Sequence, residues 1–277
     1  VSGTRIIGAF KDLDRVLEKN NFDRVVLAIP LRYYYRINEL VESCEKVGIK
    51  AEIIPDYIRY FPAQPSVDMI EDIPIINIRY VPLDDDFNKF LKYTSDYIIS
   101  IIATIITSPI MIFTAIAIKL TSRGPIIFKQ VRIGHNGKPF SMYKFRSMKV
   151  QDPGLEKSEW TTKNDPRKTL VGNFIRRTSI DELPQFFNVL KGDMSVVGPR
   201  PERPYFVEQF KKDVPKYMVK HQVRPGITGW AQIHGCRGDT SIKRRIQYDI
   251  EYVENWHMGL DLAIMIKTTL KKNPNAY

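Results

Sequence analysis

The sequence predicts a mixed α/β protein with two parts: a small N-terminal unit and a larger basic unit that contains one apolar helix. Three observations support this class. Short apolar runs alternate with helical patterns near the N-terminus, and residues 97–118 form a run of 22 residues without a charge. Residues 1–90 hold 12 basic and 15 acidic residues, a net charge of −3, whereas residues 91–277 hold 30 basic and 16 acidic residues, a net charge of +14. Parts of opposite charge are typical of units with different partners.

The first unit, residues 1–90, shows the alternation of strands and helices that is typical of a parallel sheet. The expected elements are strands at residues 5–10, 24–30 and 51–55, helices at residues 12–21 and 34–47, a C-cap at Gly48 and an irregular Pro-rich stretch at residues 56–90. Neither GxGxxG nor GxxxxGK[ST] occurs in this unit. A docking or regulatory module is therefore favoured over a nucleotide-binding one.

The uncharged run at residues 97–118 predicts a membrane element. As a helix it would be about 33 Å long, close to the ~30 Å hydrocarbon core of a bilayer. A buried helix of a soluble core is disfavoured because such helices normally keep a polar stripe. Pro109 removes one backbone hydrogen bond, and the hydroxyl of Ser108 can satisfy a carbonyl that this break frees. Two arrangements stay open: a kinked span, and a re-entrant hairpin that enters and leaves by the same face.

Basic residues flank the apolar run on both sides, and no acidic residue occurs between residues 97 and 151. The positive-inside rule places both flanks on the cytosolic side, which a re-entrant hairpin satisfies and a straight span does not. The same cations favour contact with anionic lipid, at about 1 kcal/mol per well-placed charge. A membrane-tethered nucleic-acid binder is a competing interpretation, but the sequence contains no recognised nucleic-acid-binding motif.

Residues 179–182, with the sequence SIDE, are the first candidates for chemistry. Ser179 and Glu182 have the spacing of a capping box, in which both side chains bind backbone N–H groups at a helix start. Alternatively, an aspartate at this place attacks phosphorus while its neighbour holds Mg²⁺. Asp181 and Glu182 would point about 100° apart on a helix, which favours different roles for the two. The spacing leaves both interpretations open.

The loop at residues 198–204, GPRPERP, is the second candidate. Its three prolines and one glycine predict a rigid loop. Such a loop presents Arg200 and Arg203 with little loss of entropy on binding, and the planar guanidinium fork suits phosphate oxygens. An ordinary proline-rich turn with solvated arginines fits the spacing equally well.

Two further stretches carry weaker signals. Residues 224–235, RPGITGWAQIHG, predict a tight turn and a short strand, with Trp230 more typical of a core than of a ligand platform. Residues 248–271 are amphipathic, which fits either an interfacial helix or a core helix. The histidines and cysteines show no metal-ligand spacing. They are His135, His221, His234, His257, Cys44 and Cys236.

Five motifs, in this order, resemble those of one family. They are KFRSM (144–148), SIDELPQ (179–185), SVVGPRPERP (195–204), RPGITGWAQIHG (224–235) and YDIEYVENW (248–256). The chain is similar to the bacterial polyprenol-phosphate sugar phosphotransferases, also called monotopic phosphoglycosyl transferases, over about residues 91–277. Longer members carry transmembrane helices and a Rossmann-like domain before the catalytic part. Residues 1–90 are therefore expected to be a Rossmann-like fragment in the C-terminal portion of a longer protein.

The resemblance implies a reaction and a location. Members transfer a sugar 1-phosphate from a UDP-sugar to undecaprenyl phosphate and release UMP, the first membrane step of exopolysaccharide, capsule or O-antigen synthesis. The large class commonly uses UDP-glucose or UDP-galactose. The resemblance also implies a re-entrant membrane helix at residues 91–122, broken at Ser108 and Pro109, and a mainly helical catalytic domain at residues 123–277. This domain would lie on the cytoplasmic face of the bacterial inner membrane, with anionic lipid and not nucleic acid as a partner. A homodimer is left open.

The resemblance also assigns the site. Asp181 would attack the sugar-bearing phosphorus to give an aspartyl-phosphosugar intermediate, and Glu182 would hold Mg²⁺ together with Asp181. The family's Pro-Arg-Pro loop falls on Pro199, Arg200 and Pro201 and would contact the nucleotide. Further candidates for phosphate neutralisation are Lys144, Arg146, Arg176, Arg177 and Arg203. The alternative is a non-catalytic lipid-binding scaffold of polysaccharide assembly, in which Asp181 and Glu182 are replaceable.

Overall fold

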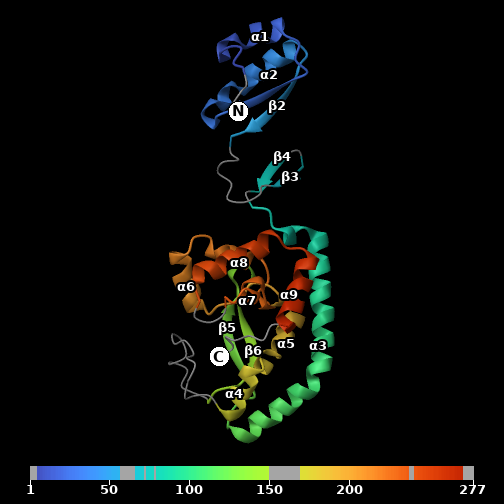
Figure 1. The fold of residues 1–277 in the computed structure, drawn as a ribbon, viewed down its shortest axis with the longest axis vertical. Helices are drawn as coiled ribbons and strands as arrows, with labels where there is room; N and C mark the ends of the chain where they lie inside the picture. The colour runs from blue at the N-terminus through green and yellow to red at the C-terminus, as the bar shows by residue number, and fades with distance from the viewer. Residues whose placement is uncertain are drawn as a thin grey trace. The chain divides into compact units, whose positions relative to one another are not determined.

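The computed structural model describes residues 5–56, 66–71, 73–77, 79–149, 169–236 and 240–270. It is a mixed α/β fold that divides into two compact units, Val1–Tyr80 and Val81–Tyr277 (Figure 1). The division falls before the expected boundary at residue 90. The reason is that Val81 and Leu83 are buried in the main core of the second unit.

The first unit is built on a two-stranded parallel sheet, as predicted. β1 (Arg24–Ile29) pairs in parallel with β2 (Lys50–Pro55), and α2 (Ile37–Lys46) lies between them in the chain. The prediction of a helix before β1 is also confirmed, by α1 (Leu13–Lys19). The buried members of the core are Leu27, Ile29 and Leu40.

Two predictions for this unit are wrong. Residues 5–9 form no strand, and a 3-10 turn, Phe10–Asp12, follows them. Ile6 and Ile7 are exposed, so this apolar run has no sheet to pack into. The stretch expected to be irregular contains an antiparallel hairpin of β3 (Ser66–Ile70) and β4 (Ile73–Asn77). Proline within a run argues against a strand, but both strands of an isolated hairpin are edge strands, where proline is tolerated.

α3 (Asp86–Thr121) is one helix of 36 residues that contains the whole uncharged run. Its N-cap, Asp85, accepts a hydrogen bond from the backbone N–H of Asn88 at 3.0 Å. Pro109 lies inside the helix, and the Ser108 hydroxyl donates to the carbonyl of Ile105 at 2.8 Å. Figure 1 shows α3 bending in its second half, and proline is a known cause of such bends.

The apolar surface of α3 is mostly exposed. Only 17% of its most apolar window is buried, whereas the core helix of a soluble protein is mostly buried. By length and composition the helix could cross a membrane. Its strongly exposed apolar side chains include Ile98, Ile102, Ile105, Ile106, Ile112, Phe113, Ile116 and Leu120.

The second unit surrounds two small sheets. β5 (Ile127–Ile133) and β6 (Pro139–Phe145) form an antiparallel hairpin, and β7 (Ser195–Val197) pairs in parallel with β8 (Gly226–Thr228). The described helices after α3 are α4 (Leu170–Arg177), α5 (Gln185–Leu190), α6 (Pro204–Asp213), α7 (Trp230–Ile233), α8 (Ile242–Glu254) and α9 (Met258–Leu270). The main core includes Val197, Tyr252 and Ile264, which join β7, α8 and α9.

The amphipathic stretch at residues 248–271 is two helices and not one. α8 ends at Glu254 and α9 begins at Met258, and Trp256 between them is buried. α9 buries Ile264 but exposes Leu262, Ile266 and Leu270, which recur at helical spacing. The apolar surface expected for an interfacial helix is therefore confined to one stripe of α9.

Glycines bring the Pro-rich loop and the RPGITGW motif together. The register of β7 and β8 places Ser195 opposite Gly226. A Cβ atom on Gly226 would lie 2.1 Å from the backbone nitrogen of Gly198, and one on Gly229 would lie 2.3 Å from the carbonyl oxygen of Gly198. Any side chain at these positions would separate the two segments.

A buried ionic network connects α3 to the core. Lys92, with 2% of its surface exposed, donates to Asp96 at 3.1 Å, to Asp261 of α9 at 2.7 Å and to the carbonyl of Val197 at 3.0 Å. The Ser195 hydroxyl donates to Asp96 at 2.6 Å, and the Tyr252 hydroxyl donates to Asp261 at 2.8 Å. These contacts tie α3, β7, α8 and α9 to one another.

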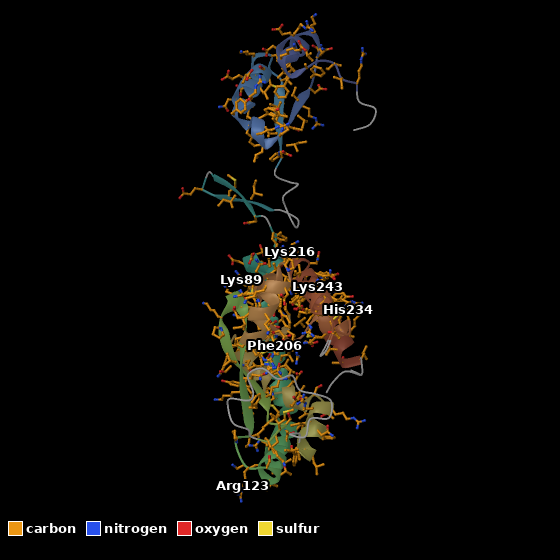
Figure 2. The ribbon with its side chains drawn as sticks, turned by 90° about the vertical axis from the view of Figure 1, so that its left-hand side faces the viewer. Lys89, Arg123, Phe206, Lys216, His234 and Lys243 are labelled. Carbon is orange, nitrogen blue, oxygen red and sulfur yellow. The ribbon has the colours of Figure 1, made fainter. Side chains whose placement is uncertain are left out.

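We expect Lys92→Met to destabilise the protein strongly. The change leaves Asp96 and Asp261 buried without their cation, and breaking a buried ion pair in this way costs about 3–5 kcal/mol. Thermal and denaturant unfolding in detergent would measure the loss. The matched control is Lys243→Met, on an exposed turn of α8 (Figure 2). Equal stability of the two variants would contradict the structural role of the network.

Candidate active site

The SIDE motif forms a 3-10 turn, Ile180–Glu182, between α4 and α5. Ser179 precedes it in the left-handed region, with φ 58°, and its side chain makes no capping hydrogen bond. The Glu182 N–H instead donates to the backbone carbonyl of Ser179 at 3.1 Å, which is the hydrogen bond of the 3-10 turn. The capping-box interpretation is therefore wrong, and the two carboxylates are available for other contacts.

Glu182 brings together side chains from three segments. Lys144 of β6 donates to its Oε1 at 2.9 Å, and Arg200 of the Pro-rich loop donates to the same oxygen at 3.1 Å. All three side chains are largely buried. The carboxylate of Glu182 raises the pKa of Arg200, which keeps this guanidinium charged. The structure thus joins the KFRSM, SIDELPQ and GPRPERP motifs at one carboxylate.

Asp181 differs from its neighbour. It is 9% exposed, and within the described residues its carboxylate has no hydrogen-bond or ion-pair partner. Burial raises its pKa to about 6, against the opposing charge of Lys144 and with a further raising effect from Glu182. Burying a carboxylate without partners is energetically unfavourable. Such a group therefore indicates a functional site, in which its oxygens contact a ligand.

Three other predicted cations have different positions around this pair. Arg176 is half-buried, and its charge lowers the pKa of Asp181, so it lies near the carboxylate. Arg177 is exposed and makes no ion pair with any residue that the structure describes. Arg203 lies over the Phe206 ring at 4.6 Å (Phe206 is labelled in Figure 2). The flanking Pro199 and Pro201 are buried.

Arg146 has a structural position. Its guanidinium donates to the carbonyl of Arg123 at 2.8 Å and to both the carbonyl and the hydroxyl of Ser122 at 2.8 Å. These groups follow the C-terminal end of α3, whose last carbonyls lack helical partners. Arg146, which directly follows β6, therefore holds the segment after α3 against the end of the strand that carries Lys144.

Sequence reasoning missed the residues that support the loop. Arg132 of β5 donates to the carbonyl of Pro201 at 3.0 Å and pairs with Glu202 at 3.5 Å. The buried Glu202 also accepts from Arg245 of α8 at 2.9 Å. Burial and the charges of Arg200 and Arg203 lower the pKa of Arg132 to about 10, although Glu202 opposes this. Glu202 could have indicated these residues, because a carboxylate within a rigid, buried loop needs a cation as its partner.

The described residues contain no group of three or more His, Cys, Asp or Glu side chains that could hold a metal ion. Asp181 and Glu182 would supply only part of a Mg²⁺ shell. Mg²⁺ is usually bound through one or two carboxylates, with water and substrate phosphates as the other ligands. The unpartnered carboxylate of Asp181 fits that mode of binding.

Comparison with known proteins places the chain in a family. The family model described as bacterial sugar transferase matches residues 87–273. The chain belongs to the bacterial sugar transferase family. The matched segment includes α3, the Asp181–Glu182 pair and the Pro-rich loop, so the family region and the second structural unit largely coincide.

Curated members of the family are similar over nearly the whole chain. The chain is 41% identical over 276 residues to a UDP-glucose:undecaprenyl-phosphate glucose-1-phosphate transferase of Klebsiella pneumoniae, covering 98% of this chain and 59% of that protein. A protein of the same name from Xanthomonas campestris is 38% identical over 97% of this chain and 57% of its own length. An undecaprenyl-phosphate galactose phosphotransferase of Salmonella typhimurium is 45% identical over 65% of this chain and 40% of its own length. The chain thus spans little more than half the length of the first two relatives.

We expect Asp181→Asn to stabilise the folded protein at neutral pH. A carboxyl group whose pKa rises from 3.8 to about 6 on folding stabilises the protein below the lower value, and this contribution is lost as the pH rises through the higher one. The side-chain amide of the Asp181→Asn variant does not ionise, so this variant does not lose that stability. Melting temperatures measured between pH 4 and 8 should separate as the pH rises from about 4 to about 6, with the variant higher, and the difference should stay constant above that range.

The matched control for this prediction is Asp213→Asn, because Asp213 is an exposed aspartate at the end of α6. We expect no pH-dependent difference between this control and the wild type. A lower melting temperature for Asp181→Asn at pH 7.5 would show that the carboxylate stabilises the fold, and it would contradict the buried, unpartnered state.

Proposed function

We propose that this bacterial sugar transferase moves a sugar 1-phosphate from a UDP-sugar to undecaprenyl phosphate, with UMP and undecaprenyl-diphospho-sugar as products. The observation that carries the proposal is the buried, unpartnered carboxylate of Asp181 next to Glu182, Lys144 and Arg200. The names of the relatives support the two substrates, with glucose or galactose as the sugar. A non-catalytic scaffold would have no use for a carboxylate held in this unfavourable state.

The proposed reaction has two displacements at phosphorus. An Asp181 oxygen attacks the sugar-bearing phosphorus of the UDP-sugar, the bond from this phosphorus to the bridging oxygen breaks, and UMP leaves with that oxygen. A phosphate oxygen of the lipid then attacks the same phosphorus, and the carboxylate is released unchanged. The covalent intermediate lets the soluble donor and the lipid acceptor use one site in turn.

Cations and anions have separate tasks in this proposal. Lys144 and Arg200 would bind phosphate oxygens in which negative charge develops during the displacement. Until substrate arrives, Glu182 accepts the hydrogen bonds of both cations, which lie close enough to Asp181 to lower its pKa. Bound Mg²⁺, held by Asp181 and Glu182, would neutralise the diphosphate of the donor. Arg176 would add a further positive charge near the reacting phosphorus.

The lipid acceptor requires a site at the membrane surface. α4, which carries Arg176, contacts α3 and exposes Leu170 and Phe174 to 93% and 62%. These apolar side chains and the exposed surface of α3 would enter the lipid, which brings the dyad next to the acceptor phosphate. The bend of α3 and its two basic flanks favour the re-entrant arrangement on the cytoplasmic face of the inner membrane (Figure 1).

Release of UMP tests the reaction. Protein in detergent is incubated with undecaprenyl phosphate, Mg²⁺ and a panel of UDP-sugars. We expect UMP with one donor, dependent on the lipid, and ping-pong kinetics. Asp181→Asn should remove turnover while the protein stays folded, since amide nitrogen and oxygen cannot replace the attacking carboxylate. Full turnover by this folded variant would exclude the nucleophile assignment.

The pH dependence should respond to Lys144. The ammonium of Lys144 lowers the pKa of Asp181, so Lys144→Gln should raise it and shift the acid limb of kcat/KM to higher pH. Lys191→Gln, on an exposed lysine bound to Tyr143 of the same strand at 2.6 Å, is the control and should leave the limb in place. An unchanged acid limb in Lys144→Gln would mean that Asp181 does not titrate in this step.

A further inference from the structure

A polar cavity lies in the second unit, apart from the Asp181–Glu182 pair. It encloses about 350 Å³ and is lined by the first turns of α3, the turn between β5 and β6, strand β7, residues 222–224 and α8. Neither carboxylate of the pair lines it, and neither do Lys144 and Arg200. The volume is within the range of pockets that bind small molecules.

The cavity and the candidate active site lie toward different ends of this unit. Figure 2 shows Lys89, which lines the cavity, and Arg123 at opposite ends of the unit. Arg146, just after β6, binds the Arg123 carbonyl, and Lys144 lies two residues before it, near the end of β6. A ligand in the cavity would therefore occupy a different place from a ligand held by Lys144.

Arg224 is the main polar group of the cavity. Its guanidinium lies over the ring of Tyr93 at 3.6 Å, and within the described residues it has no hydrogen-bond or ion-pair acceptor. Its backbone is held firmly, because the next residue, Pro225, accepts a bond from the Ser195 N–H at 2.8 Å. A guanidinium fixed by stacking, with its donors unused, is pre-organised for an oxyanion.

A second cation faces the same space. Lys89 lines the cavity, and its described partner is the exposed Asp86, at 3.4 Å. Lys92 also lines it, but its charge is already matched by Asp96 and Asp261. His135 is bonded to the Gln222 carbonyl at 3.1 Å, and burial lowers its pKa, so it is neutral near pH 7. Arg224 and Lys89 thus supply two positive charges, which match a phosphate dianion, and Asp84 is the acid at the exposed rim.

We propose that this cavity binds a small organic phosphate, with the phosphate group on Arg224 and Lys89. The apolar side chains of Leu83, Val197 and Val223 line the remaining surface and would contact the organic part. Ser195 and Val197 belong to β7, which leads directly into the loop that presents Arg200. Occupation of the cavity would therefore stabilise the strand on which this loop depends.

Calorimetric titration of the chain in detergent tests the site, with glycerol 3-phosphate as the probe and glycerol as the phosphate-free reference. We expect one binding event for glycerol 3-phosphate and none for glycerol. Arg224→Gln and Lys89→Gln should each weaken binding about tenfold or more, since each removes a charge-assisted contact. Lys243→Gln, which changes an exposed lysine, should bind as the wild type does.

The same titration separates this site from the proposed active site. Arg200→Gln should retain the binding event if it belongs to the cavity and lose it if the probe binds beside Glu182. Nanodiscs with phosphatidic acid distinguish the source of the phosphate: displacement of the probe would identify a lipid headgroup, and retention a soluble molecule. Loss of binding in Arg200→Gln, wild-type affinity in folded Lys89→Gln, or no binding to wild type at millimolar probe would overturn the proposal.

Discussion

The arrangement of the second unit depends on the hydrogen bonds and ion pairs that the buried ammonium group of Lys92 makes. It is almost fully buried, yet it binds carboxylates from α3 and α9 and a backbone carbonyl of β7. A lone charge at this depth would cost several kcal/mol, so loss of either the lysine or its aspartates would leave the remaining charges unfavourably buried. The network fixes a long, otherwise apolar helix to the catalytic core at one defined register, which apolar packing alone specifies poorly.

The position of Arg200 follows from this register. Val197, whose carbonyl binds Lys92, ends β7, and the rigid loop with Arg200 begins at the next residue. The opposite side of the loop is bound by β5, through Ile133 and Arg132, which bind the carbonyls of Glu202 and Pro201 at 3.0 Å. Arg200 therefore reaches Glu182 from a support held on two sides. Pre-organised charge of this kind is the main source of rate enhancement in phosphoryl transfer.

The sequence predicted the composition of the site better than its geometry. The family resemblance carried by the five ordered motifs placed Asp181, Glu182 and Arg200 in one site, and the structure brings the last two into contact. The spacing of residues within a motif did not predict side-chain partners that come from distant parts of the sequence. The SIDE spacing left a capping box open as one of two interpretations, but Lys144 and Arg200 attract Glu182 more strongly than a backbone N–H does. Likewise, Arg146 has the residue type of a phosphate ligand, but only the fold shows that the end of α3 occupies its guanidinium.

Asp181 and Glu182 lie in different environments, which suit the two carboxylates to different roles. Glu182 binds Lys144 and Arg200 through its Oε1 atom, whereas the Asp181 carboxylate has no hydrogen-bond or ion-pair partner among the described residues. Burial raises the pKa of Asp181 to about 6, a value that suits a group acting as both nucleophile and leaving group close to neutral pH. An aspartate with its own ion pair would be a poor nucleophile, and one with a low pKa would be displaced so easily that the intermediate would be lost to water. The different environments of the two adjacent residues therefore suit the proposed covalent intermediate, which would have to persist until a lipid phosphate reaches it.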